Sequence, residues 1–182
     1  MQVSADVIAD RCLQRGKADR AIEGGEPAHI AADLLSQAEH DELAASILIT
    51  TDEAFGRRVA DELENQLASL SREAIARQSI ENYGAIIVAR DLFEAAEFSN
   101  RIAPEHLELA VAEPFELLPQ IRHAGAVFLG HNTPEAAGDY LAGPNHTLPT
   151  GGTARFFSPL GTDDFVKKSS LISFSKAGLE RL

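Results

Sequence analysis

Glu105 and His106 form a neighbouring acid–base pair within residues 103–107 (APEHL). Histidine titrates near neutrality without adjustment, whereas a glutamate needs an environment that raises its pKa before it can act as a base. Neighbouring side chains on an extended segment point to opposite faces, so the two need not touch. A plain helix-to-strand turn explains the same residues, because Pro104 disfavours helix for Ala103. Composition alone favours that turn.

Gln37 and His40 are three residues apart in a helical pattern, so their side chains can reach one ion from one helix face. Histidine is a common zinc ligand, but the amide oxygen of glutamine is a weak donor. Asp139, far along the chain, offers a hard anionic oxygen. Taken alone, these residues are more typical of a solvated helix surface, a partly buried histidine and an exposed aspartate than of a metal site.

Residues 138–168 form a long run with five glycines and almost no apolar periodicity. Loops of this length are uncommon in compact domains unless they build a binding or active site. Pro144 and Pro149 restrict its path, and glycines let the backbone approach a ligand closely. His146, in the sequence Gly-Pro-Asn-His, is the histidine that such a rigid loop would present.

Short apolar runs, typical of buried parallel strands, alternate with helical patterns in most of the chain. We expect strands at residues 6–9, 46–50, 84–89, 107–111 and 125–129, and helices beginning near 53 and spanning 72–82 and 91–101. Thr50 and Glu53 have capping-box spacing, and Thr133 before Pro134 is a good N-cap for a short helix. The alternation predicts an α/β fold, a mainly parallel sheet with helices on both faces.

Composition excludes several partners. The formal charge of −12 argues against nucleic acid and anionic membranes, because phosphate binding needs clustered cations. The single cysteine, Cys12, rules out an internal disulfide and a cysteine-based zinc site, and it fits a reducing cytoplasm. No apolar run is long enough for a membrane span, and the first residues lack the form of a signal peptide.

Taken together, the sequence Ser36-Gln37-Ala38-Glu39-His40, the Pro104-Glu105-His106 segment and the 138–168 loop resemble histidinol dehydrogenase over residues 30–182. That family makes histidine by two successive NAD-dependent oxidations of the amino alcohol L-histidinol, through the aldehyde, at a zinc site. The resemblance implies an incomplete Rossmann-like sandwich, a cytoplasmic homodimer and the cofactors Zn2+ and NAD.

The resemblance also implies roles for individual residues. Glu105 and His106 are expected to be catalytic, with His106 taking the alcohol proton and Glu105 activating water. The expected zinc ligands are Gln37, His40 and Asp139. Those three, His106 and His146 are expected to bind the substrate, together with Ser4, where the local sequence departs from the family pattern. No GxGxxG motif is present, and the cofactor-binding residues are unknown.

The resemblance is weakest at both ends of the chain. We expect three parts: residues 1–29, a strand plus a poorly matching link; residues 30–157, the α/β catalytic core; and residues 158–182, the start of a truncated helical segment. Family members carry an N-terminal nucleotide-binding segment and a C-terminal tail with a fourth zinc ligand, so we expect an incomplete, weakly active or inactive enzyme.

Two alternatives remain open. The chain could be a non-catalytic remnant that at most binds metal or a partner subunit. It could also be a family member that oxidises another small alcohol.

Overall fold

The computed structural model of the chain describes residues 17–22 and 25–182. The strand predicted at 6–9, and Ser4, lie outside these residues. The strands are β1 (Lys17–Ile22), β2 (Ala45–Thr50), β3 (Ala85–Val88), β4 (His106–Ala110) and β5 (Ala126–Leu129). The helices are α2 (Pro27–Ala38), α3 (Glu53–Leu67), α4 (Glu73–Tyr83), α5 (Leu92–Ile102), α6 (Pro114–Leu117), α7 (Glu135–Tyr140) and α8 (Lys176–Leu179), with 3-10 turns η1 (Leu118–Gln120), η2 (Thr153–Arg155) and η3 (Thr162–Phe165).

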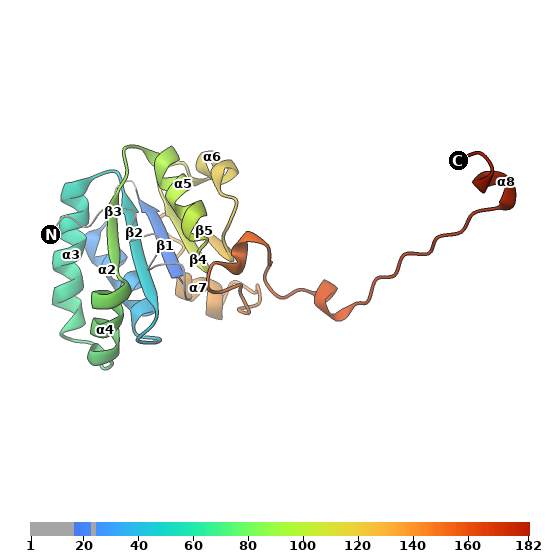
Figure 1. Cartoon of the computed structure of the whole chain (residues 1–182). Coiled ribbons are helices and arrows are strands. Elements are labelled where there is room, and N and C mark those ends of the chain that lie inside the picture. Colours follow the sequence, from blue (N-terminus) through green and yellow to red (C-terminus); the bar gives the residue numbers. More distant parts are fainter. Residues whose placement is uncertain (1–16, 23–24) are drawn as a thin grey trace.

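The five strands form one parallel sheet in the order β3-β2-β1-β4-β5. This is the strand order of a doubly wound sheet, which reverses direction between β1 and β4. Helices cover both faces, as the strand–helix alternation predicted (Figure 1). The fold is therefore an incomplete Rossmann-like sandwich.

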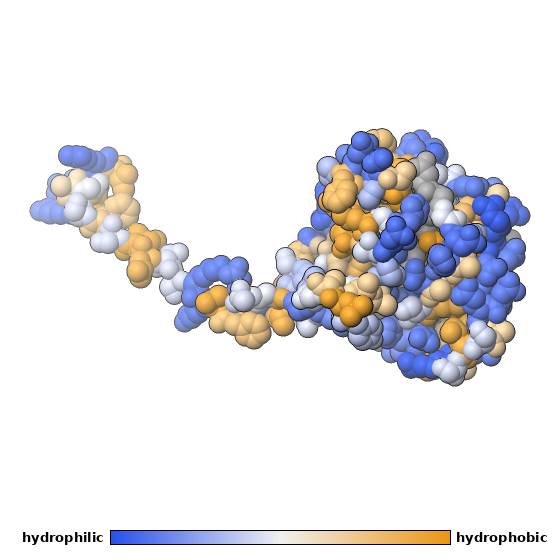
Figure 2. Space-filling model, turned by 180° about the vertical axis from the view of Figure 1, so that it is seen from behind, coloured by the Kyte–Doolittle hydropathy of each residue, from blue (hydrophilic) through white to orange (hydrophobic). Residues whose placement is uncertain are grey.

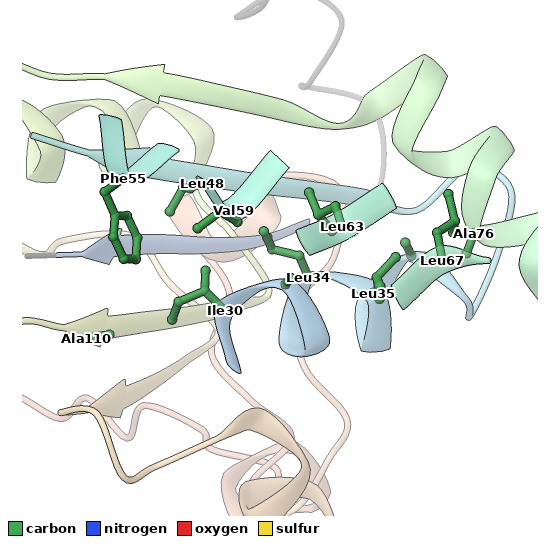
Figure 3. Close-up of a cluster of buried hydrophobic side chains, with 12 residues drawn as sticks. Ile30, Leu34, Leu35, Leu48, Phe55, Val59, Leu63, Leu67, Ala76 and Ala110 are labelled. Atoms are coloured by element: carbon green, nitrogen blue, oxygen red, sulfur yellow. The ribbon is translucent and has the colours of Figure 1, made fainter. Parts of the chain in front are cut away.

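Each face of the sheet has its own core. On one face, α2, α3 and α4 bury apolar side chains against Leu48 and Ala110 (Figure 3). Helix α3 contributes Phe55, Val59, Leu63 and Leu67. On the other face, α5 and α6 pack on Ile47, Ile49, Leu107 and Leu109. Since successive strand residues alternate in direction, β2 and β4 contribute to both cores.

The helix N-termini are capped differently from the prediction. Asp52, rather than Thr50, caps α3, because its side chain accepts a 2.8 Å hydrogen bond from the amide of Ala54. Thr133 is not the N-cap of α7 either: its hydroxyl donates to the carbonyl of Leu129, and the helix begins after Pro134. The hydroxyls of Thr50 and Thr133 each bond to a nearby backbone group instead of capping a helix, and capping-box spacing alone does not predict this.

The strand β1 is the main difference from the sequence analysis. The sequence of this strand, KADRAI, lies in the segment that we expected to be an irregular link, yet β1 is the middle strand of the sheet. Apolar patterning does not predict β1, because a central parallel strand is normally a continuous apolar run and β1 carries three charged residues.

The last residues leave the body of the molecule. After η2 the chain extends away from the sandwich, through η3, to the single turn of α8 (Figure 1). Apolar side chains are exposed on this segment, as Figure 2 shows; they include Phe165, Val166, Leu171, Ile172 and Phe174. Among the described residues, no helix is both long and apolar enough to cross a membrane.

Leu107→Ala should lower the free energy of unfolding by about 2–5 kcal/mol, because Leu107 is fully buried in β4 and its loss leaves a cavity. Chemical denaturation monitored by circular dichroism measures the change. The matched control is Leu171→Ala, the same substitution at a side chain that is 96% exposed, and it should leave stability nearly unchanged. Equal losses for both variants would contradict the assignment of β4 to the core.

Candidate functional site

The candidate site lies at the amino edge of the sheet, where β4 begins. Ser46, Ala18 and His106 are aligned in register across β2, β1 and β4. The Ser46 hydroxyl donates a 2.8 Å hydrogen bond to the carbonyl of Leu34, which holds that turn of α2 against the start of β2. Neighbouring strands are spaced by about 4.8 Å, so Ser46, which holds the Leu34 turn of α2, lies two strand spacings, roughly 10 Å, from His106.

Helix α7 lies on the same face as α2. One small cavity is bounded by the first turns of α2, by Glu108 and Ala110 of β4 and by Gly130 and Pro134, which precede α7. Helix α2 follows the parallel strand β1, so it starts at the carboxyl edge of the sheet and ends towards the amino edge. Helix α7 begins beside β4, where its first residue, Glu135, contacts both Glu108 and His106.

His106 is buried at the first position of β4, with 3% of its surface exposed. Its Nδ1 lies 3.7 Å from the Oε1 of Glu135, the first residue of α7. The imidazole ring is tilted against Phe128, with 6.0 Å between ring centroids, and stacked on His146 at 5.8 Å and 24°. Strand, helix and loop thus fix one imidazole from three sides.

Two buried glutamates accompany this histidine. Glu108, on the same face of β4, accepts a 3.2 Å hydrogen bond from the backbone N–H of Glu135 through its Oε1. Glu108 and Glu135 are 6% and 4% exposed. Sequence analysis gave neither residue a role, although a glutamate inside the otherwise apolar run of β4 was a usable signal, since carboxylates are rarely buried without partners.

Glu105 is half-buried and lies just before β4. Its carbonyl accepts a 2.8 Å hydrogen bond from Ala126, and the carbonyl of Pro104 accepts one from Gly125. Ala103 has a left-handed backbone, with φ of 54°, and ends α5. The predicted helix-to-strand turn is therefore present, and it carries the acid–base pair.

Gln37 and His40 differ in their surroundings. Helix α2 ends at Ala38, so only Gln37 is helical, and the amide of His40 closes the last turn on the Gln37 carbonyl at 3.3 Å. Gln37 is buried, at 6% exposure, whereas His40 is exposed. The predicted single helical face is therefore replaced by a helix end and the turn that follows it.

Asp139 belongs to the last turn of α7, and its side chain lies outside what the structure describes, as does Ser4. His146 is exposed, in the irregular segment after α7. Asn145 holds that segment in shape: its Oδ1 accepts a 2.7 Å bond from Thr147, and its amide donates to the Leu160 carbonyl. The long loop predicted from the sequence is thus present and carries the histidine expected of it.

Zinc is the ion that the resemblance implies. No group of three His, Cys, Asp or Glu residues suited to a metal occurs in the described part of the chain. Glutamine is not one of those residue types, and the side chain of Asp139 is not described. The side chains of Gln37 and His40 accept or donate no hydrogen bond to other described residues. An amide oxygen and an imidazole are both groups that can bind zinc.

Two cavities lie close to this region without including the predicted residues. The small one, of about 60 Å³, lies at the carboxyl edge and is lined by His29, Asp33, Glu108 and His131 among others. The larger one, of about 590 Å³, lies beside the end of α5 and is lined by Arg101, Arg122, His123 and Arg155 among others. Neither of these two cavities is lined by His106, Gln37 or His40.

The fold and this cluster define an α/β sandwich domain that gathers an imidazole and carboxylates at the amino edge of its sheet. The sequence profile of the histidinol dehydrogenase family matches residues 18–182. The chain belongs to the histidinol dehydrogenase family.

Individual relatives agree. The chain is 78% identical over 158 residues to histidinol dehydrogenase from Geobacter sulfurreducens, covering 87% of this chain and 37% of the relative. It is 54% identical over 184 residues to the enzyme from Wolinella succinogenes, covering 100% of this chain and 41% of that relative. The crystal structure of histidinol dehydrogenase from Elizabethkingia anophelis superposes with a TM-score of 0.83 at 40% identity, over 91% of this chain and 38% of that one. The chain spans about two fifths of the length of these relatives.

Gly125→Ala should disturb the candidate site through the backbone, because an added Cβ would lie 2.5 Å from the carbonyl oxygen of Glu105. Relieving this overlap has to move β5 or the Glu105–His106 segment, so we expect a loss of about 1–3 kcal/mol in unfolding free energy. Heteronuclear NMR should show shifted amide resonances for both residues.

Gly161→Ala is the matched control, since its Cβ would meet nothing closer than 3.9 Å. It should leave the spectrum of residues 105–106 unchanged. A Gly125 variant as stable as the native chain would show that the approach of β5 to Glu105 is looser than described.

Proposed function

We propose that this chain carries the catalytic core of a histidinol dehydrogenase, which oxidises L-histidinol to L-histidine through the aldehyde. The observation that carries the proposal is the buried His106 at the start of β4, next to Glu105 and 3.7 Å from the carboxylate of Glu135 on α7. The family supplies the reaction, and this cluster supplies the acid–base groups that the reaction needs.

His106 is the proposed general base. As the alcohol carbon gives up a hydride, the hydroxyl oxygen loses its proton to a ring nitrogen of His106. Its burial limits the access of water to the proton transfer. The ring of His146 stacks on that of His106, which suits the proposed role of His146 in substrate binding.

Glu105 is proposed to serve the second oxidation. The aldehyde has to gain the oxygen of a water molecule before a second hydride can leave and the carboxylate can form. A carboxylate half-buried beside the base can take the proton from that water, provided that its surroundings keep it basic enough.

Gln37, His40 and Asp139 are the proposed zinc ligands, and Ser4 is a further proposed substrate contact. Zinc, when bound, would act as a template that holds the amino alcohol and its imidazole in place. NAD, when bound, would accept the two hydrides; no residue of this chain is assigned to its binding. Uncommitted side chains at Gln37 and His40 support this assignment.

We further propose that the protein is a cytoplasmic homodimer, with residues 30–157 as its catalytic core and 158–182 as a separate segment. The apolar side chains of the extended C-terminal segment support the dimer, because exposed apolar surface of this size favours association (Figure 2). The single Cys12 supports the cytoplasm, because it is typical of a reducing compartment.

A non-catalytic remnant is the second candidate function. The fact that favours it is coverage, since the chain spans 37–41% of the Geobacter and Wolinella enzymes. A domain that folds without the rest of the active site would keep metal binding and lose turnover. An enzyme of the same family acting on another small alcohol is a third candidate, and substrate screening would identify it.

A zinc-binding measurement tests the proposed ligands independently of turnover. The native chain should take up zinc, and His40→Asn should weaken binding by about tenfold or more, because a ligand is lost. Isothermal titration calorimetry measures both. His29→Asn on the first turn of the same helix is the control, and it should bind zinc like the native chain. Equal weakening by both variants, or no uptake by the native chain, would contradict the ligand set.

The purified chain should oxidise histidinol with NAD very slowly or not at all. Hydride transfer requires the nicotinamide to be held within about 3–3.5 Å of the reacting carbon, and no residue of this chain is assigned to NAD binding. NADH absorbance measures the rate. Substantial NADH formation that His106→Ala abolishes would show that the chain is a working enzyme by itself. Introducing His106→Ala into the full-length Geobacter relative at the aligned position should abolish turnover there; full activity would refute the role of His106.

A further inference from the structure

Glu135 and His106 form a buried pair between α7 and β4. The Oε1 of Glu135 lies 3.7 Å from Nδ1 of His106, and the two side chains are 6% and 4% exposed. This separation is an ion-pair distance, somewhat longer than a hydrogen bond, and apo active sites often show such distances before substrate tightens them. The carboxylate therefore faces one particular nitrogen of the ring.

Glu135 is held in place by contacts of its own. Its backbone N–H donates to Glu108 Oε1 at 3.2 Å, and the preceding turn is tied down by the Thr133 hydroxyl on the carbonyl of Leu129 at 2.7 Å. Gly138 lets α7 lie close to β5, since a Cβ there would be 2.3 Å from the ring of Phe128. The carboxylate is thus fixed by the same strands that carry the histidine.

His106 cannot readily turn its ring away. Its backbone is paired with β1 at Ala18 and with β5 at Ala126. Phe128 and His146 lie against the ring, at 6.0 and 5.8 Å between centroids. With Nδ1 towards Glu135, the other nitrogen, Nε2, is directed to a different side of the ring.

We infer that Glu135 is a positioning residue that holds His106 in the tautomer protonated on Nδ1, which leaves Nε2 unprotonated to take the alcohol proton. The inference deepens the proposed function, because it specifies which nitrogen of the base reacts. A buried carboxylate beside a neutral imidazole favours a proton on the facing nitrogen, where an N–H donates to it. Glu108 supports this arrangement by holding the first residue of α7.

A purely structural role would be different. A buried carboxylate–imidazole pair that only holds α7 to β4 would affect stability when removed, but it would not need to select a tautomer. The measurement that separates these roles is therefore the protonation of each ring nitrogen, rather than stability.

The test uses the complete 182-residue chain with 15N-labelled histidine, at a pH well above the ordinary histidine pKa and without zinc or NAD. The His106 ring resonances are those that disappear in His106→Asn. In the native chain, Nδ1 should be protonated and Nε2 bare. Glu135→Met, which keeps the side-chain size but removes the acceptor, should lose this preference, so that Nε2–H becomes the main form. Glu135→Gln, whose amide oxygen still accepts, should restore Nδ1–H.

Glu108→Gln is the control, because it removes a buried charge from the same face of β4 but keeps an oxygen for the Glu135 N–H. It should retain the native tautomer. A native chain with Nε2–H, or a Glu135→Met variant that keeps Nδ1–H, would overturn the inference. If Glu135→Met does not fold, judged by its amide spectrum, the native and Glu135→Gln spectra still decide. The experiment measures ring-nitrogen protonation and not turnover. Its outcome therefore tests the role of Glu135 even if the proposed function is wrong.

Discussion

The pairing of β4 on both sides is the constraint on which the candidate site depends. Backbone hydrogen bonds to β1 and β5 fix the register of β4, with His106 beside Ala18 and Ala126. Because side chains alternate along a strand, this register puts His106 and Glu108 on one face and Leu107 on the other. A slip of one residue would exchange the two sets and bury the imidazole in the apolar core.

The same strand therefore combines two opposing demands. Leu107 and Leu109 are fully buried and contribute to the core under α5 and α6. His106 and Glu108 place polar groups on the opposite buried face, where each must find partners because desolvation is costly. Helix α7 provides those partners, because its first residue contacts His106 through its side chain and Glu108 through its backbone N–H. The apolar packing of Leu107 and Leu109 on one face of β4 thus holds in place the strand that carries His106 and Glu108 on the other face.

Sequence patterns predicted most of the fold because local signals agree with it. Strands β2 to β5, the start of α3 and helices α4 and α5 were predicted within one or two residues, since apolar runs and helical periodicity mark them. Strand β1 could not be predicted, because its charged sequence is atypical of a central strand. In the site, the resemblance singled out Glu105 and His106, whereas Glu135 required knowledge of which helix lies across β4. That information is tertiary, and no spacing along the chain contains it.

The central claim is that the amino edge between α2 and α7 is the place where metal and base meet. Adding Mn2+ in place of zinc to the 15N-labelled chain tests this directly, because a paramagnetic ion broadens the resonances of nearby nuclei. The account predicts that broadening is strongest for Gln37, His40 and His106 and weaker for His29 and His131 at the small carboxyl-edge cavity, because it falls steeply with distance from the ion. Selective broadening of His29 and His131, with His106 unchanged, would contradict it.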